Sequence, residues 1–98
     1  MEKRTPHHRL DEVKALVEAD AMKVTFSATV TGRELGFSEI DIKNIVKSLS
    51  RNDFNKSMTS YSDHQEWQDV YNPKTTAGIV YLKLTVRGDV VILSFKEK

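Results

Sequence analysis

The feature that most restricts the fold of this sequence is an alternating segment near its C-terminus. Residues 78–86 read GIVYLKLTV, and after Gly88 and Asp89 the apolar run VVILSF returns over residues 90–95. Strict alternation of apolar and polar residues is typical of a strand with one buried face, and Gly-Asp between two such runs is typical of a two-residue hairpin turn. The chain must therefore build an antiparallel sheet at this end.

The period of two also predicts which side chains of residues 78–86 point inward. Only one face can bury the four apolar residues at even positions together: Val80, Leu82, Leu84 and Val86. We expect helices to cover that face. The intervening Tyr81, Lys83 and Thr85 then point to the opposite, open face.

The first half of the chain has the period of helices instead. We expect a first helix from Leu10 to about Ala19, a short strand over 22–26, and a second helix capped by Ser27 and closed by Gly36. A third helix has the clearest start signal, because Ser38 and Asp41 have the spacing of a capping box. Its buried stripe consists of Ile42, Ile45, Val46 and Leu49.

Beyond Arg51 we expect strands over 54–61 and 66–71, with a turn at 72–74. The chain has 98 residues, of which 39% are hydrophobic, and this is enough for one core but not two. We therefore expect one domain, residues 1–98, of the α+β class. Three helices, mainly in the N-terminal half, pack on one face of a mostly antiparallel sheet of about six strands.

Composition excludes several classes of function. The absence of cysteine excludes disulfides, thiolate catalysis and Cys-based zinc sites. No apolar run is long enough for a signal peptide or a membrane span, so we expect a cytoplasmic protein with no membrane contact. The net charge is close to zero, with 15 Lys and Arg against 14 Asp and Glu, and therefore does not predict a broad nucleic-acid-binding face. The acidic excess lies within residues 10–53, so an anionic ligand is expected at the N-terminal tip or in the C-terminal half.

Residues 55–71, NKSMTSYSDHQEWQDVY, are too polar for a simple core strand. Lys56 and Met58 share one face of the predicted strand 54–61. If Lys56 and Gln68 also turn to the open face, they share it with Tyr81. A cation, an amide and a phenol then meet on one surface.

Such a set suits RNA cleavage by attack of the 2′-hydroxyl on the adjacent phosphate, because the substrate supplies its own nucleophile. Lys56 supplies positive charge, Gln68 holds a phosphate oxygen or a base edge, and Tyr81 carries a proton. Met58, with Trp67 or Tyr71, offers an apolar platform for bases. Free lysine and tyrosine titrate near about 10, so base catalysis at neutral pH requires a depressed pKa.

The segments MEKRTPH, KSMTSYSDH, WQDVY, VYLKLTV and SFKEK closely resemble the MqsR toxin family, from end to end of the chain. The resemblance implies a RelE-like ribonuclease fold and an endoribonuclease that cuts mRNA at GCU-type triplets, independently of metals, other cofactors and ribosomes. It also implies a bacterial cytoplasmic protein. The implied partner is an MqsA-type antitoxin, a zinc-binding and DNA-binding dimer that neutralises the toxin and represses the shared operon.

The family's catalytic residues correspond to Lys56, Gln68 and Tyr81. Met58 and His7 belong to the supporting residues by the same resemblance, although N-terminal packing is an equally good interpretation of His7. One departure is Gly88, where a family member has histidine. Arg87 is hypothesised to contact phosphate in its place, and Lys83 is included among the RNA-binding residues.

Three simpler interpretations stand beside these. Trp67 is expected to be structural and half-buried, His8 is expected in solvent, and the 63–64 pair is expected to form a turn. The open face is also consistent with a binding module, or with a catalytically weak homologue that binds only its antitoxin.

Overall fold

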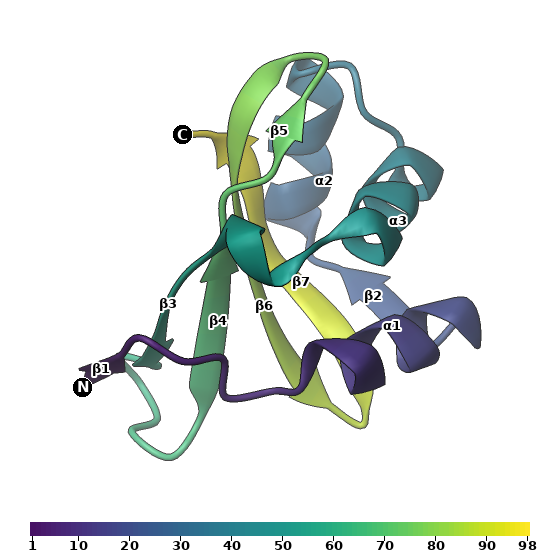
Figure 1. The fold of residues 1–98 in the computed structure, drawn as a ribbon. Coiled ribbons are helices and arrows are strands. Elements are labelled where there is room, and N and C mark those ends of the chain that lie inside the picture. The colour runs from purple at the N-terminus through teal and green to yellow at the C-terminus, as the bar shows by residue number, and fades with distance from the viewer.

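The computed structural model describes residues 1–98 and has three helices on one face of a curved, seven-stranded sheet (Figure 1). The elements are β1 (Glu2–Lys3), α1 (Leu10–Glu18), β2 (Met22–Val24), α2 (Phe26–Glu34), α3 (Glu39–Ser48), a 3-10 turn (Arg51–Asp53), β3 (Phe54–Thr59), β4 (Trp67–Tyr71), β5 (Lys74–Thr75), β6 (Gly78–Arg87) and β7 (Asp89–Glu97). This confirms the predicted α+β class. The sheet has seven strands, where about six were expected, because it also contains β1 and β5, which have only two residues each.

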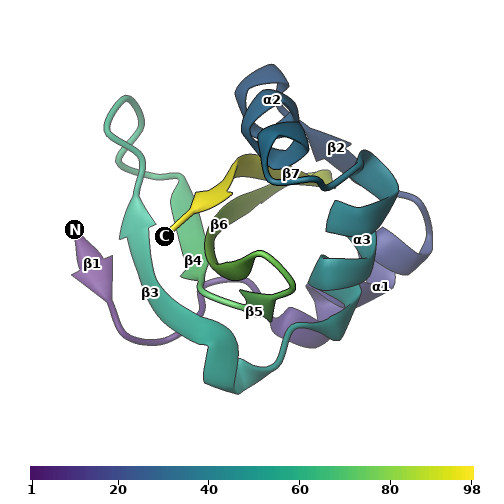
Figure 2. The same ribbon diagram turned by 90° about the horizontal axis from the view of Figure 1, so that it is seen from above.

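The sheet has the order β1-β3-β4-β6-β7-β2, and β5 pairs with β6. All pairs are antiparallel except β2 with β7, which are parallel in the register Met22↔Val90. Figure 2 shows the helices together beside the strands, with β1 at the edge farthest from them. The predicted polar stretch 55–71 thus forms β3, β4 and their connecting loop within the sheet.

A core of buried side chains fills the space between the helices and the sheet. The predicted inward residues Val80, Leu82 and Leu84 are fully buried, and Val86 packs against them partly buried. The helices and the other strands contribute Val13, Val17, Ala28, Ile42, Val46, Leu49, Tyr71, Val90, Ile92 and Phe95. Strand parity therefore predicted the buried face correctly.

The start of α3 confirms one predicted cap, and the start of α2 corrects another. Ser38 and Asp41 form the reciprocal capping box, in which the Asp41 N–H donates to Ser38 Oγ at 3.2 Å. Helix α2 begins at Phe26, so its cap is Thr25 and not Ser27; Thr25 Oγ1 accepts from Ala28 N at 3.2 Å. The strand ends before Phe26 because the extended Thr25 cap starts the helix there.

The hairpin between β6 and β7 is tighter than predicted. Arg87 pairs with Asp89, so the turn centres on Gly88 alone, whose φ is +77°. Glycine adopts this left-handed backbone without the steric cost that a side chain adds. Asp89 is thus the first residue of β7, which continues to Glu97.

Candidate active site

Strand register brings the predicted catalytic residues to one face of the sheet. Lys56 pairs with Val70, and Val70 pairs with Lys83. Cross-strand partners point the same way, so Lys56 and Lys83 share a face. Gln68 is two residues from Val70, and Tyr81 is two residues from Lys83, which places both on that face as well. We define the open face by Lys56, Met58, Gln68, Tyr81, Lys83 and Lys96, opposite the helix-packed side.

These residues form three rows across the strands. Met58 pairs with Gln68 in the first row, Lys56 lies in the row of Lys83, and Tyr81 pairs with Lys96 in the third. Rows two residues apart are separated by roughly 7 Å, so Gln68 and Tyr81 lie about 13 Å apart along the strands. The open face is therefore an elongated track with Lys56 and Lys83 at its middle, and the three predicted catalytic groups do not meet at one point.

The Lys56 ammonium is paired with a carboxylate from the N-terminal strand. Its Nζ lies 3.1 Å from Glu2 Oε1, and Glu2 is in register with Met58 on β3. The hydrogen bond from Lys56 lowers the pKa of Glu2. A phosphate that approaches Lys56 must therefore compete with this carboxylate.

Gln68 and Arg87 are both bound to Glu66. Gln68 Nε2 donates to Glu66 Oε1 at 3.1 Å, and Arg87 donates to both carboxylate oxygens, from Nε at 3.1 Å and from Nη2 at 2.9 Å. These bonds, first that of Arg87, lower the pKa of Glu66. Arg87, hypothesised to contact phosphate, is thus engaged in an ion pair within the protein.

In the third row, the ammonium group of Lys96 lies over the ring of Tyr81. Lys96 Nζ lies 5.3 Å from the centre of the Tyr81 ring. Burial, and then the charge of Lys96, lower the pKa of Lys83 in the neighbouring row. Lys96 was not among the predicted site residues. The alternation that continues past the buried Phe95 indicates that Lys96 points to the open face.

His7 lies on the other side of the sheet from Gln68. Its ring stacks on Trp67 with centroids 5.4 Å apart, and its Nδ1 is 2.9 Å from Lys3 Nζ. Trp67 precedes Gln68 in β4, so the two side chains point to opposite faces. Desolvation, and then Lys3, lower the pKa of His7. His7 is exposed at the surface, and its contact with the half-buried Trp67 places it away from the open face.

A buried carboxylate holds this N-terminal segment in place. Asp69 has no exposed surface and accepts hydrogen bonds from the backbone N–H of His7 at 3.1 Å and of His8 at 2.9 Å. It also accepts from Ser57 Oγ at 2.6 Å. His8, expected in solvent, is consequently half-buried, and its Nε2 is 3.2 Å from the Trp67 carbonyl oxygen.

Comparison with known proteins shows the family of this chain. A model of the family described as "Motility quorum-sensing regulator, toxin of MqsA" matches residues 5–97. The chain belongs to the MqsR toxin family. A relative from Escherichia coli (strain K12), named mRNA interferase toxin MqsR, is 55% identical over 98 residues and is covered completely, as is this chain. The resemblance inferred from five short segments is thereby confirmed for the whole MqsR-like chain.

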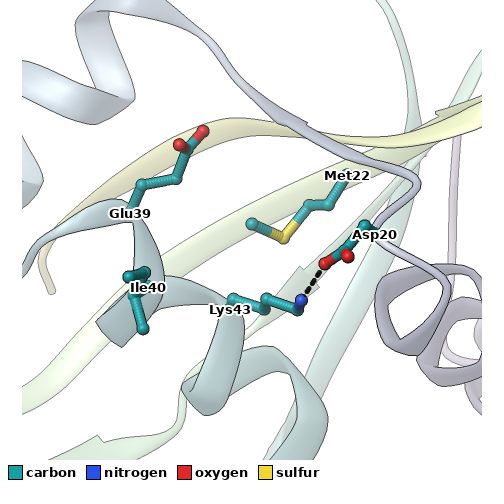
Figure 3. Close-up of a pocket in the computed structure, with 5 residues that line it drawn as sticks. All are labelled: Asp20, Met22, Glu39, Ile40 and Lys43. Carbon is teal, nitrogen blue, oxygen red and sulfur yellow. Dashed lines mark hydrogen bonds and ion pairs between the residues drawn. The ribbon is translucent and has the colours of Figure 1, made fainter.

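One further feature of this MqsR family member, a surface pocket, lies away from the open face. This pocket beside β2 and the start of α3 is lined by Asp20, Met22, Glu39, Ile40 and Lys43, and the Lys43–Asp20 ion pair crosses it (Figure 3). No helix of the structure has the length and apolar character needed to cross a membrane.

Proposed function

We propose that this chain is an mRNA interferase, an endoribonuclease that cleaves single-stranded RNA through attack of the 2′-hydroxyl on the adjacent phosphate. The observation that carries the proposal is the central row of the open face, in which Lys56 and Lys83 lie in register across β3, β4 and β6. The E. coli relative, which is named an mRNA interferase toxin, supports the same activity. We further propose that the reaction requires neither a metal nor a ribosome.

In the proposed reaction, the 2′-oxygen loses its proton, attacks phosphorus and displaces the 5′-oxygen of the next nucleotide. Lys56 stabilises the negative charge that develops on the phosphorane. Lys83 is suited to accept the 2′-hydroxyl proton, because burial and Lys96 lower its pKa and so favour the neutral amine. Tyr81 beside Lys96 is suited to protonate the 5′-oxygen. The products are a 2′,3′-cyclic phosphate and a 5′-hydroxyl.

The first row is assigned to base binding. Met58 and Gln68 are cross-strand partners, so an apolar side chain and an amide lie side by side. Unstacked RNA bases are commonly bound by such a combination of an apolar surface and a polar group at the base edge. We propose a GCU-type cleavage preference on the basis of the family alone.

Family membership also supports a specific regulator. The matching family is described as the toxin of MqsA, so we propose that an MqsA-type antitoxin, binding zinc and DNA, neutralises this chain in the bacterial cytoplasm. Any contact of this chain with operator DNA is then indirect, through the antitoxin.

The test is cleavage of a defined mRNA by purified protein in EDTA and without ribosomes, with the cut sites and end groups mapped. We expect cuts that end in 2′,3′-cyclic phosphate, and their loss on Lys56→Ala with an unchanged circular dichroism spectrum. Lys47→Ala is the matched control, because Lys47 lies on α3, on the helix side of the sheet, and its ion pair with Glu18 has the same 3.1 Å distance as that of Lys56 with Glu2. The absence of cutting by folded wild-type protein refutes the nuclease, and cutting that requires added metal refutes the metal-independent mechanism.

A further inference from the structure

Glu66 lies at the end of the track, between the side chains of Gln68 and Arg87. Both carboxylate oxygens are engaged by Arg87, and Oε1 also accepts from Gln68 Nε2. The Glu66 side chain is only 18% exposed, whereas that of Arg87 is 53% exposed. Glu66 is thus fixed from the solvent side by a two-bond guanidinium contact, which is the geometry that best immobilises a carboxylate.

This contact fixes the orientation of the Gln68 amide. An ionised carboxylate can only accept hydrogen bonds, so the amide must turn its NH₂ group to Glu66 and its carbonyl oxygen away from it. Gln68 is only 9% exposed, and its carbonyl oxygen makes no hydrogen bond to the protein. The oxygen keeps a small exposed area, because the Tyr71 hydroxyl is the one fully buried side-chain polar atom without a partner. A fixed acceptor is therefore presented on the open face next to Met58.

We propose that Glu66 is a positioning residue that sets the base preference of this site through Gln68. The inference rests on the proposed function, because it takes RNA as the ligand of the open face. A fixed carbonyl acceptor pairs with a base that offers an exocyclic amino group at its edge, such as the N4 amino group of cytosine. Uracil has the O4 carbonyl at the same position, and two facing carbonyl oxygens cannot form a hydrogen bond.

Replacing Glu66 with glutamine removes the requirement that orients the amide. The new side chain can donate as well as accept, so Gln68 can present either its NH₂ or its carbonyl oxygen to the base. Discrimination between an amino group and a carbonyl group should then disappear, although Gln68 itself is unchanged. A base that leaves this largely buried acceptor without a donor typically binds about fivefold to 100-fold more weakly, and this discrimination is expected to be lost.

The experiment measures binding of short 2′-O-methyl RNAs, which lack the attacking hydroxyl and so cannot be cut by the proposed route. Pairs of these RNAs differ by one cytosine-to-uracil replacement, made at each position in turn. For wild-type protein we expect one position at which cytosine binds at least about fivefold more tightly than uracil. We expect this ratio to fall to about 1 in Glu66→Gln and to persist in Glu34→Gln, a control that removes the same charge from the end of α2.

A second variant separates positioning from a general structural effect. Gln68→Met removes the amide, so it should abolish the ratio by itself, and adding Glu66→Gln should then change nothing further. An unchanged ratio in Glu66→Gln, or no position with a preference in wild-type protein, overturns the inference. Failure of the nuclease proposal is separate, because it appears as intact RNA in the cleavage assay while the binding ratio still decides the role of Glu66.

Discussion

Replacement of Asp69 with asparagine tests whether one buried carboxylate holds the N-terminal segment against the sheet. The change keeps the shape of the side chain but turns one acceptor into an NH₂ group. Three donors face the two oxygens of Asp69: His7 N–H and Ser57 O–H at Oδ1, and His8 N–H at Oδ2. Whichever way the asparagine amide turns, at least one donor meets another donor inside the protein.

The magnitude follows from the kind of bond lost. A hydrogen bond to a charged group contributes about 1.5–3 kcal/mol, and asparagine loses at least one such bond and the charge assistance of the others. We therefore expect the free energy of unfolding to fall by about 2–4 kcal/mol. At about 4–8 °C per kcal/mol for a domain of this size, the Tm should fall by roughly 10 °C or more.

Urea denaturation of wild type and Asp69→Asn measures this difference, with hydrogen exchange of the His7 and His8 amides as the local readout. Asp89→Asn is the control, because the Asp89 pair with Lys23 is long, at 3.8 Å, and near the surface, and should contribute less than about 0.5 kcal/mol. A loss of under about 1 kcal/mol with both amides still protected would show that Asp69 does not anchor the segment.

Two other predictions concern single side chains. The buried Tyr71 hydroxyl has no hydrogen-bond partner, so Tyr71→Phe should leave stability unchanged or raise it by up to about 1 kcal/mol in urea denaturation. Burial raises the pKa of Tyr71 to about 12, above its usual value of 10. The free energy of unfolding of the wild type should therefore be constant below pH 10 and fall between pH 10 and 12, where only the unfolded chain ionises. Tyr71→Phe should reduce that fall, and equal falls in both proteins would contradict this. Glu2→Gln removes the carboxylate that competes with RNA phosphate for Lys56, so KM for RNA should fall by no more than about fivefold with kcat unchanged, and a rise in KM would exclude such competition.

Local patterns explain why much of the fold was predictable. The alternation in residues 78–86 and the Ser38–Asp41 box each depend on neighbours within a few positions, and both predictions hold. Strand β1 and the parallel pairing of β2 depend instead on partners more than 50 residues away. Two or three residues carry too little period for such pairing to be read from sequence.

The candidate site divides in the same way. Parity placed Lys56, Gln68 and Tyr81 on one face correctly, because it needs only the period of a strand. The pairing of Arg87 with Glu66 was not foreseen, since it depends on the register between β4 and β6. The anchoring role of Asp69 also escaped prediction, because nothing local distinguishes a buried aspartate from an exposed one in WQDVY.

Strand β7 places a constraint on the synthesis of this chain. It is the last element made, yet β2 has no other neighbour in the sheet, and β6 needs β7 along its whole length. While the ribosome is still adding residues 89–97, the earlier helices cannot close over a complete sheet, and Lys96 is missing from the row of Tyr81. Contacts between distant parts of a chain form late in folding. The open face is therefore complete only once β7 has paired with β6, and the nascent chain lacks the full track until then.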